Sequence, residues 1–179
     1  GKTVDEIKDM KTKKVDDGHP AVPDESDLTS LVTISVQDYI AVVAEAWDKA
    51  IDVDSADKVG LGVKVSIASS KDADEENGPV AQVDTVMTAT AITADGKVAG
   101  TIIDNAQTRV NFDKDGQLTS DPNAEYKTKV ELGDEYGMKA RSEIGMEWYE
   151  QIAELGKWMT GKTLDEIKGM KTKKVDDGH

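Results

Sequence analysis

The sequence contains no cysteine, and other side chains with versatile chemistry are also few. Without a thiol, the chain can form neither a disulfide nor a thiolate ligand or nucleophile. Only two histidines are present, His19 and His179, each following an Asp-Asp-Gly run. A histidine-based acid–base mechanism therefore has no sensible candidate. Nucleophile-elbow, phosphate-loop and His-Glu-x-x-His motifs are missing as well, so we expect a protein that is not an enzyme of a familiar type.

The sequence also lacks a run of about 18 apolar residues and a charged-then-apolar leader. We therefore expect no membrane contact from this segment and place any signal or anchor outside it. Lys and Arg number 22 against 36 Asp and Glu, a net charge of −14. Nucleic acids and anionic membranes attract clustered positive charge, so this balance argues against both as partners. An acidic repeat chain without cysteine fits the exported surface proteins of bacteria, although many cytosolic proteins have the same composition. From the repeat and the composition together, we expect an extracellular or cell-surface location.

The most informative feature of the sequence is an internal repeat. Residues 1–19 return at residues 161–179 with two differences, Val4 against Leu164 and Asp9 against Gly169. A self-match of this length indicates tandem duplication. We interpret the chain as one full repeat plus the tail of a preceding one, taken from a longer array, with neighbouring copies of the repeat as partners. The expected parts are a tail and linker at 1–27, a repeat domain at 28–170 and the start of the next linker at 171–179.

Each copy of the repeated block predicts a short helix, at residues 3–10 and 163–170. Thr3 and Glu6 have capping-box spacing, in which the hydroxyl and the carboxylate each accept a backbone N–H of the first turn. The apolar stripes of the two helices are Val4, Ile7 and Met10, and Leu164, Ile167 and Met170. So short a helix is marginal alone in water. We expect the C-terminal copy to dock on its own domain, and the N-terminal copy to be mobile or held by a neighbouring molecule.

Residues 11–27 are polar and aperiodic. Pro20 and Pro23 restrict the residues before them to extended shapes, so we interpret the stretch as the inter-repeat linker. His19 lies beside the aspartates of the same turn, which leaves metal ligation open, although a solvated linker histidine is the commoner case.

A helix is predicted at residues 35–51, where Ser35 can cap the first turn and an apolar stripe follows at helical spacing. Tyr39 and Trp47 belong to this stripe. They are candidates for lining a ligand pocket, but a stripe of this kind is more often part of a core.

The hydrophobic period then changes from that of a helix to that of a strand. Alternation of apolar and polar residues predicts a strand at 63–67, and a run rich in Thr, Val and Ala predicts a longer strand at 80–93. Asp95-Gly96 is a strong hairpin signal. Further strands are expected after this turn, at 97–104, at 107–112 and at 126–132. The sequence thus predicts an α+β fold with an antiparallel meander sheet of about five strands.

Three carboxylate-rich stretches lie in the expected turns. They are Asp52/Asp54/Asp57, Asp72/Asp74/Glu75/Glu76 and Asp113/Asp115/Asp121. Calcium prefers six to eight oxygen ligands, but no stretch has the full spacing of a calcium loop, so solvated turns are the preferred interpretation.

The strongest helix pattern covers residues 142–159, and the left-handed preference of Gly161 should end it. We expect this helix and the helix at 35–51 to cover one face of the sheet, with Trp47 and Trp148 largely buried.

The segment 131–146, directly before this helix, is the best candidate for a binding site. A helix start beside an arginine can hold a phosphate or carboxylate, and nearby rings can stack on a ligand. The alternative is a glycine-rich loop that tucks aromatic side chains into the core. The candidate ligand-binding residues are Tyr136, Met138, Arg141, Ser142 and Trp148, with Tyr149 beside them.

The strand–Asp-Gly–strand element at residues 83–108 resembles that of bacterial FMN-binding domains. With the stretch up to the 163–170 helix, the unit is similar to repeats of secreted or lipid-anchored clostridial proteins related to that family and to the major membrane immunogen lipoproteins. The resemblance implies FMN as cofactor. Family members that attach FMN covalently have a Ser or Thr acceptor before their last helix, where this chain has Met146, so it implies non-covalent binding at most.

Two classes of function therefore remain open. The first is a non-catalytic surface module that binds FMN or a small anionic ligand and serves extracellular electron transfer. The second is a purely structural or adhesive repeat without a ligand, which near-identical tandem copies favour.

Overall fold

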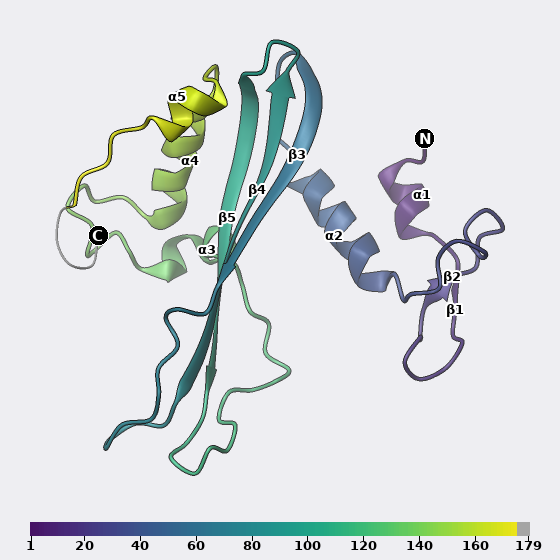
Figure 1. The fold of residues 1–179 in the computed structure, drawn as a ribbon. Coiled ribbons are helices and arrows are strands. Elements are labelled where there is room, and N and C mark those ends of the chain that lie inside the picture. Colours follow the sequence, from purple (N-terminus) through teal and green to yellow (C-terminus); the bar gives the residue numbers. More distant parts are fainter. Residues whose placement is uncertain (175–179) are drawn as a thin grey trace. The chain divides into compact units, whose positions relative to one another are not determined.

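The computed structural model describes residues 1–174, and these form two compact units, one from Gly1 to Ile51 and one that begins at Asp52 (Figure 1). Each unit is described separately. The last part of the linker expected at 171–179 lies outside the described residues. The repeat boundary near residue 27 concerns the period of the sequence and stays a prediction.

The first unit contains α1 (Val4–Lys8), β1 (Thr12–Lys13), β2 (Val22–Pro23) and α2 (Gln37–Asp48). The two short strands pair antiparallel, and α1 packs on α2. Residues 11–27 thus fold back within the unit, where Val22 and Pro23 are buried, although we expected a linker there.

The N-terminal copy of the repeat forms the predicted capped helix. Thr3 Oγ1 accepts the N–H of Glu6 at 3.2 Å, and Glu6 Oε2 accepts the N–H of Thr3 at 2.6 Å. We expected this copy to be mobile or held by a neighbouring molecule, but α1 packs instead on α2 of the same chain.

Helix α2 buries only one side within its unit. Val36, Ile40 and Ala44, spaced four apart, are buried or half-buried, whereas Tyr39 and Trp47 are 64% and 67% exposed. The aromatic stripe, which we interpreted as core, is therefore not covered within the first unit. A partner helix of five residues is too short to cover α2 all round. Packing of the 35–51 helix on the sheet would involve both units and stays a prediction.

The second unit is built on a three-stranded antiparallel sheet in the order β3–β4–β5, from Ala56–Ser66, Val80–Thr93 and Val98–Asn111. The predicted hairpin joins β4 to β5, and Gly96 has the left-handed φ of 83° that the turn requires. The residues of edge strand β3 are exposed along nearly its whole length.

The described residues are α+β, but the five-stranded meander is wrong. The chain expected to form two strands between 97 and 112 is one continuous strand, β5. Residues 126–132, expected as a strand, contain α3 (Lys129–Leu132). Its start is fixed by a capping box, in which Thr128 Oγ1 accepts the N–H of Glu131 at 3.2 Å.

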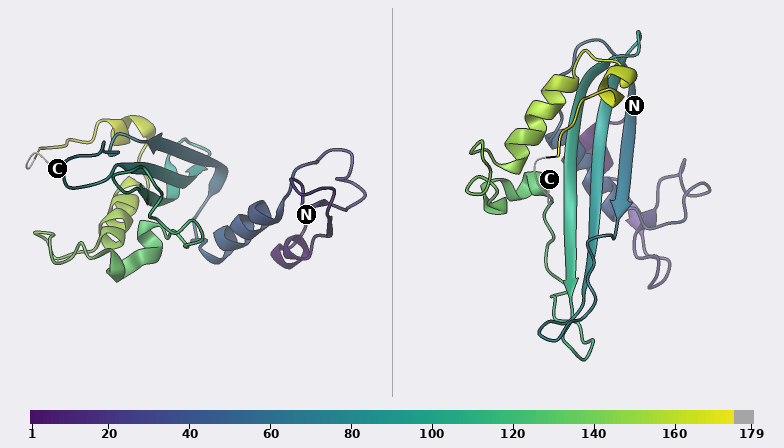
Figure 2. Two further views of the ribbon diagram at one scale, coloured as in Figure 1. Left: turned by 90° about the horizontal axis from the view of Figure 1, so that it is seen from below. Right: turned by 60° about the vertical axis from the view of Figure 1, so that its left-hand side comes forward.

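Three further helical elements complete the unit: η1 (Gly133–Tyr136), α4 (Trp148–Met159) and α5 (Leu164–Lys168). Helices α3 and α4 pack on β5, so one side of the sheet carries the helical layer (Figure 2). The predicted 142–159 helix begins six residues late, since Gly145 has a φ of 63°. Gly161 ends the helical run in the left-handed region, as predicted, and its N–H donates to Val98 O at 2.8 Å.

Candidate functional site

The predicted site residues lie in and beside the loop between η1 and α4, which the carboxylate of Glu147 holds in place. Glu147 is 2% exposed, and its two oxygens accept the N–H groups of Met138 at 2.8 Å and Lys139 at 2.9 Å. The hydrogen bond from the Lys139 N–H has the largest effect on the pKa of Glu147 and lowers it. Burial of the carboxylate acts in the opposite direction, and the Met138 N–H lowers the pKa further. The carboxylate therefore stays charged and holds the loop in a fixed position.

Tyr136 and Trp148 are brought together by a cation that the sequence analysis missed. Lys129 Nζ lies 4.9 Å from the ring centroid of Tyr136 and 5.3 Å from that of Trp148. Distances of this size are those of cation–π contacts. Trp148 is half-buried, not largely buried as expected, because it stands at the first position of α4. The Thr-x-x-Glu pattern at 128–131 was the signal that would have placed Lys129 at a helix start.

Lys129 also has a weak electrostatic influence on a polar network on the sheet. Its charge acts on Asp84, whose carboxylate accepts the side-chain amides of Gln82 at 2.9 Å and Gln107 at 3.0 Å. Burial raises the pKa of Asp84, but these hydrogen bonds and the Lys129 charge outweigh it and the pKa lies below its usual value. Arg109 Nε extends the network by donating to Gln82 Oε1 at 2.8 Å.

The other predicted residues divide into two groups. Met138 and Ser142 both lie near the Gln151 amide, which donates to Ser142 Oγ at 3.2 Å and contacts Met138 Sδ at 3.9 Å. Arg141 is exposed, and its guanidinium forms no ion pair with any described residue. The structure therefore joins four of the five residues to internal contacts and leaves Arg141 facing solvent.

The start of α4 is strongly acidic. Glu150 Oε2 accepts the N–H of Glu147 at 2.7 Å, so one free amide of the first turn already has an anionic partner. The Tyr149 hydroxyl donates to Asp134 Oδ1 at 3.3 Å, and the charge of Asp134 raises the pKa of Tyr149. An anion placed directly at this helix start would meet three carboxylates, which like-charge repulsion disfavours.

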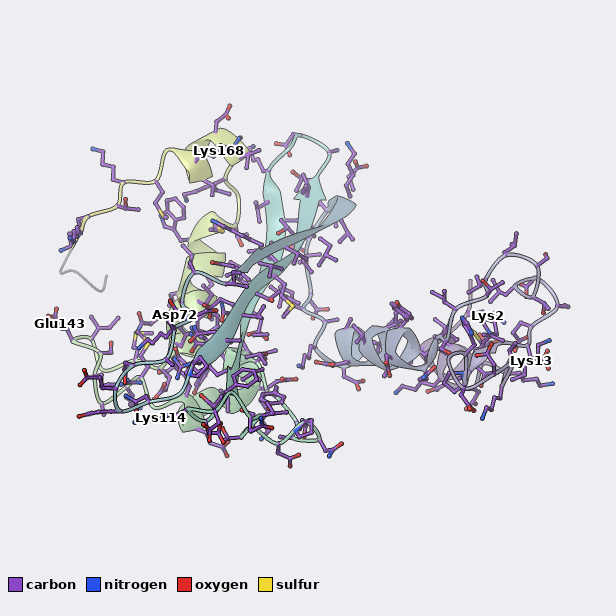
Figure 3. The ribbon with its side chains drawn as sticks, turned by 60° about the horizontal axis from the view of Figure 1, so that its bottom comes forward. Lys2, Lys13, Asp72, Lys114, Glu143 and Lys168 are labelled. Carbon is purple, nitrogen blue, oxygen red and sulfur yellow. The ribbon has the colours of Figure 1, made fainter. Side chains whose placement is uncertain are left out.

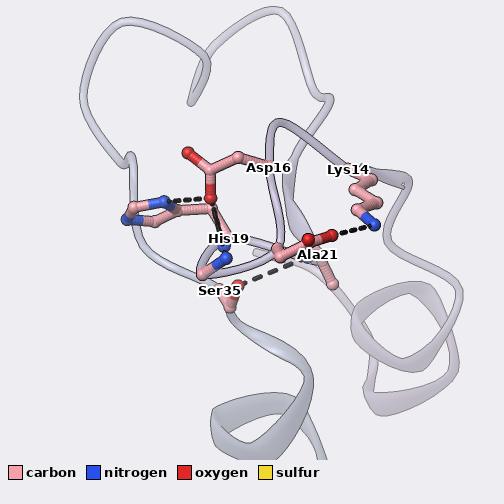
Figure 4. A network of polar contacts seen from close by, with 7 residues as sticks. Lys14, Asp16, His19, Ala21 and Ser35 are labelled. Atoms are coloured by element: carbon pink, nitrogen blue, oxygen red, sulfur yellow. Dashed lines mark hydrogen bonds and ion pairs between the residues drawn. The ribbon is translucent and has the colours of Figure 1, made fainter.

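The carboxylate clusters and His19 act within their own turns. Asp16 Oδ1 accepts from His19 Nδ1 at 2.9 Å and from the His19 backbone at 2.8 Å (Figure 4). Asp74 and Asp113 likewise accept backbone N–H groups of the turns that they open. Within residues 1–174, no group of three or more His, Asp or Glu side chains is arranged to hold a metal ion.

Elsewhere the surface carries charged side chains beside many exposed apolar ones. Charged side chains such as Asp72, Glu143 and Lys168 lie on the surface of the second unit (Figure 3). Two open hollows, of about 350 and 480 Å³, contain none of the predicted site residues. No helix in the described part of the chain is long and apolar enough to cross a membrane.

Comparison with known proteins gives one partial relative. The chain is 38% identical over 66 residues to chlorophenol reductase of Desulfitobacterium hafniense, a match that covers 37% of this chain and 19% of that protein. No family model matches the chain. No solved structure matches it either.

Proposed function

We propose that this chain is a non-catalytic module of a secreted or cell-surface tandem-repeat protein, and that it binds FMN or another small anionic ligand without a covalent bond. The observation that carries the proposal is the position of Lys129 against the rings of Tyr136 and Trp148. A flavin phosphate requires positive charge, and its ring system requires aromatic surface. The two half-buried rings offer the surface, and Lys129 together with exposed Arg141 offers the charge.

The acidic start of α4 refines where such a ligand would bind. Glu147 and Glu150 stand at the first turn, so the phosphate belongs on the Lys129 side of the rings and away from the helix amides. Chlorophenol reductase is by its name a redox protein, which makes a redox cofactor the ligand to test first.

A titration of FMN followed by flavin fluorescence tests this proposal. Replacing Lys129 with glutamine should weaken FMN binding about tenfold, because one charge-assisted contact is lost. Lys127→Gln is the matched control, since Lys127 pairs at 3.8 Å with Glu135 and contacts neither ring. Absence of FMN binding, or equal affinities for the two variants, would contradict the proposal.

A structural or adhesive repeat remains the second candidate function. The observation in its favour is that the two near-identical segments form the same capped helix in two structural settings. An absorption spectrum of protein purified from its natural host distinguishes the two candidate functions. A flavin band supports ligand binding, and its absence supports the structural or adhesive repeat.

A further inference from the structure

The two copies of the repeated segment have the same local structure but differ in what covers them. Helix α5 has the capping box of α1, with Thr163 Oγ1 accepting the N–H of Glu166 at 3.3 Å. In α1, the stripe residues Val4 and Met10 are half-buried against the first unit. Their counterparts in α5 are exposed, Leu164 by 61% and Met170 by 39%. The stripe of α5 is therefore only partly covered.

The first copy shows what kind of surface covers this stripe. In the first unit, α1 packs on α2, and Lys11, which follows α1, forms hydrogen bonds with Asp24 and Glu25. The Lys11 N–H donates to Glu25 Oε1 at 3.1 Å, and Lys11 O accepts the N–H of Asp24 at 2.7 Å. We call the surface formed by residues 20–48 the α1 groove.

The second copy carries every group that the α1 groove contacts. Residues 171–173 are Lys-Thr-Lys, as are residues 11–13, and they are exposed. The pairing of β1 with β2 and the 2.8 Å ion pair from Lys13 to Asp24 can both be reproduced by this stretch. The two sequence differences are compatible with the exchange, because Leu164 keeps the apolar character of Val4 and position 9 is exposed at the end of α1.

From this identity we infer that residues 161–174 of one copy of the chain dock in the α1 groove of a second copy, in place of that copy's own residues 1–14. The contact is heterologous, so it joins copies head to tail and fits an array of repeats. In the intact chain, the tethered α1 competes at a high effective concentration and keeps the groove closed. The inference does not depend on ligand binding at the Lys129 site.

Sedimentation of the full chain over a range of concentrations tests the inference. Ile7→Asp should release α1 and expose the groove, and the variant should form concentration-dependent oligomers. Ile167→Asp, the same change in the second copy, should leave the chain monomeric, and the Ile7→Asp/Ile167→Asp double variant should be monomeric too. A monomeric Ile7→Asp chain would overturn the inference, as would oligomers that persist in the double variant.

A labelled peptide of residues 161–179 provides a direct measurement. It should bind the Ile7→Asp chain at least tenfold more tightly than the unaltered chain, whose groove is occupied, and the Ile167→Asp peptide should bind neither. Equal binding to both chains would overturn the inference.

A substitution in the intact chain tests the fit of the second sequence without opening the groove. Val4→Leu combined with Asp9→Gly gives the first copy the sequence of the second, and the melting midpoint of the first unit should not change. A clear drop would overturn the inference, because the second sequence would then not fit.

Discussion

Replacing Gly156 with leucine should disturb the packing of α4 on β5. Gly156 is buried, and a Cβ at this position would lie 3.3 Å from Thr101 O and 3.6 Å from Thr101 Cγ2. The first distance is tighter than an ordinary van der Waals contact and involves a backbone atom of the sheet. The remaining leucine atoms have still less room, so α4 would have to move away from β5.

Two opposing terms set the size of the effect. Leucine is a better helix former than glycine by about 0.8 kcal/mol. Overpacking of a tight contact costs about 1–3 kcal/mol, and here the obstacle is backbone, so the upper end applies. We expect a net loss of about 2 kcal/mol, which lowers the melting midpoint of a unit of this size by roughly 5–10 °C.

Urea unfolding followed by tryptophan fluorescence measures this loss. A Trp47→Phe background leaves Trp148 and Trp158, both on α4, as reporters of the second unit. Ala153→Leu is the matched control, because position 153 is exposed on the same helix and should change stability by less than about 0.5 kcal/mol. A Gly156→Leu chain as stable as the unaltered protein would refute the close packing of α4 on the sheet.

Two further predictions concern the loop and the ligand site. Thr128→Ala removes the N-terminal cap of α3 and should lower the free energy of unfolding by about 1 kcal/mol. The same change should weaken FMN binding, because Lys129 directly follows the cap. Thr3→Ala, which removes the equivalent cap in the other unit, should leave FMN binding unchanged. Because the pKa of Glu147 is lowered in the folded state, its carboxylate stabilises the fold at pH values above the ordinary pKa of 4.5. This stabilisation is lost as the pH falls through the pKa of the folded state. As the pH is lowered below 4.5, the melting midpoint of the unaltered chain should therefore fall more steeply than that of Glu147→Gln. Parallel curves of melting midpoint against pH would contradict the role of Glu147 in holding the loop.

The sequence predicted those parts of the fold that local signals determine. Capping boxes placed the helices at residues 3–10 and 163–170, and the Asp95-Gly96 turn placed the β4–β5 hairpin. The same capping signal was overlooked at Thr128, where alternation of apolar and polar residues suggested a strand. Over so few residues the two patterns overlap, and the reciprocal hydrogen bonds of the cap favoured the helix.

The candidate site was predictable only in part, because its organisation depends on contacts between distant segments. Tyr136 and Trp148 were identified from their local crowding, but Lys129 reaches them from another helix. Asp84 joins the network through the cross-strand register with Gln107, which no local pattern reveals. The buried carboxylate of Glu147 was also missed, because the helix expected at 142–159 placed this residue on its polar face.

The two copies of the repeat separate local from tertiary determinants of structure. Because α1 and α5 have the same N-terminal capping box and the same length of five residues, their shared sequence is sufficient to set the helix. Their surroundings differ because the flanking chain differs: residues 20–48 cover α1, whereas α5 is anchored by the backbone pair between Gly161 and Val98. We infer that a sequence that forms one helix in both settings can exchange partners without refolding, and that the tether of α1 would then determine whether copies of the chain stay separate or join.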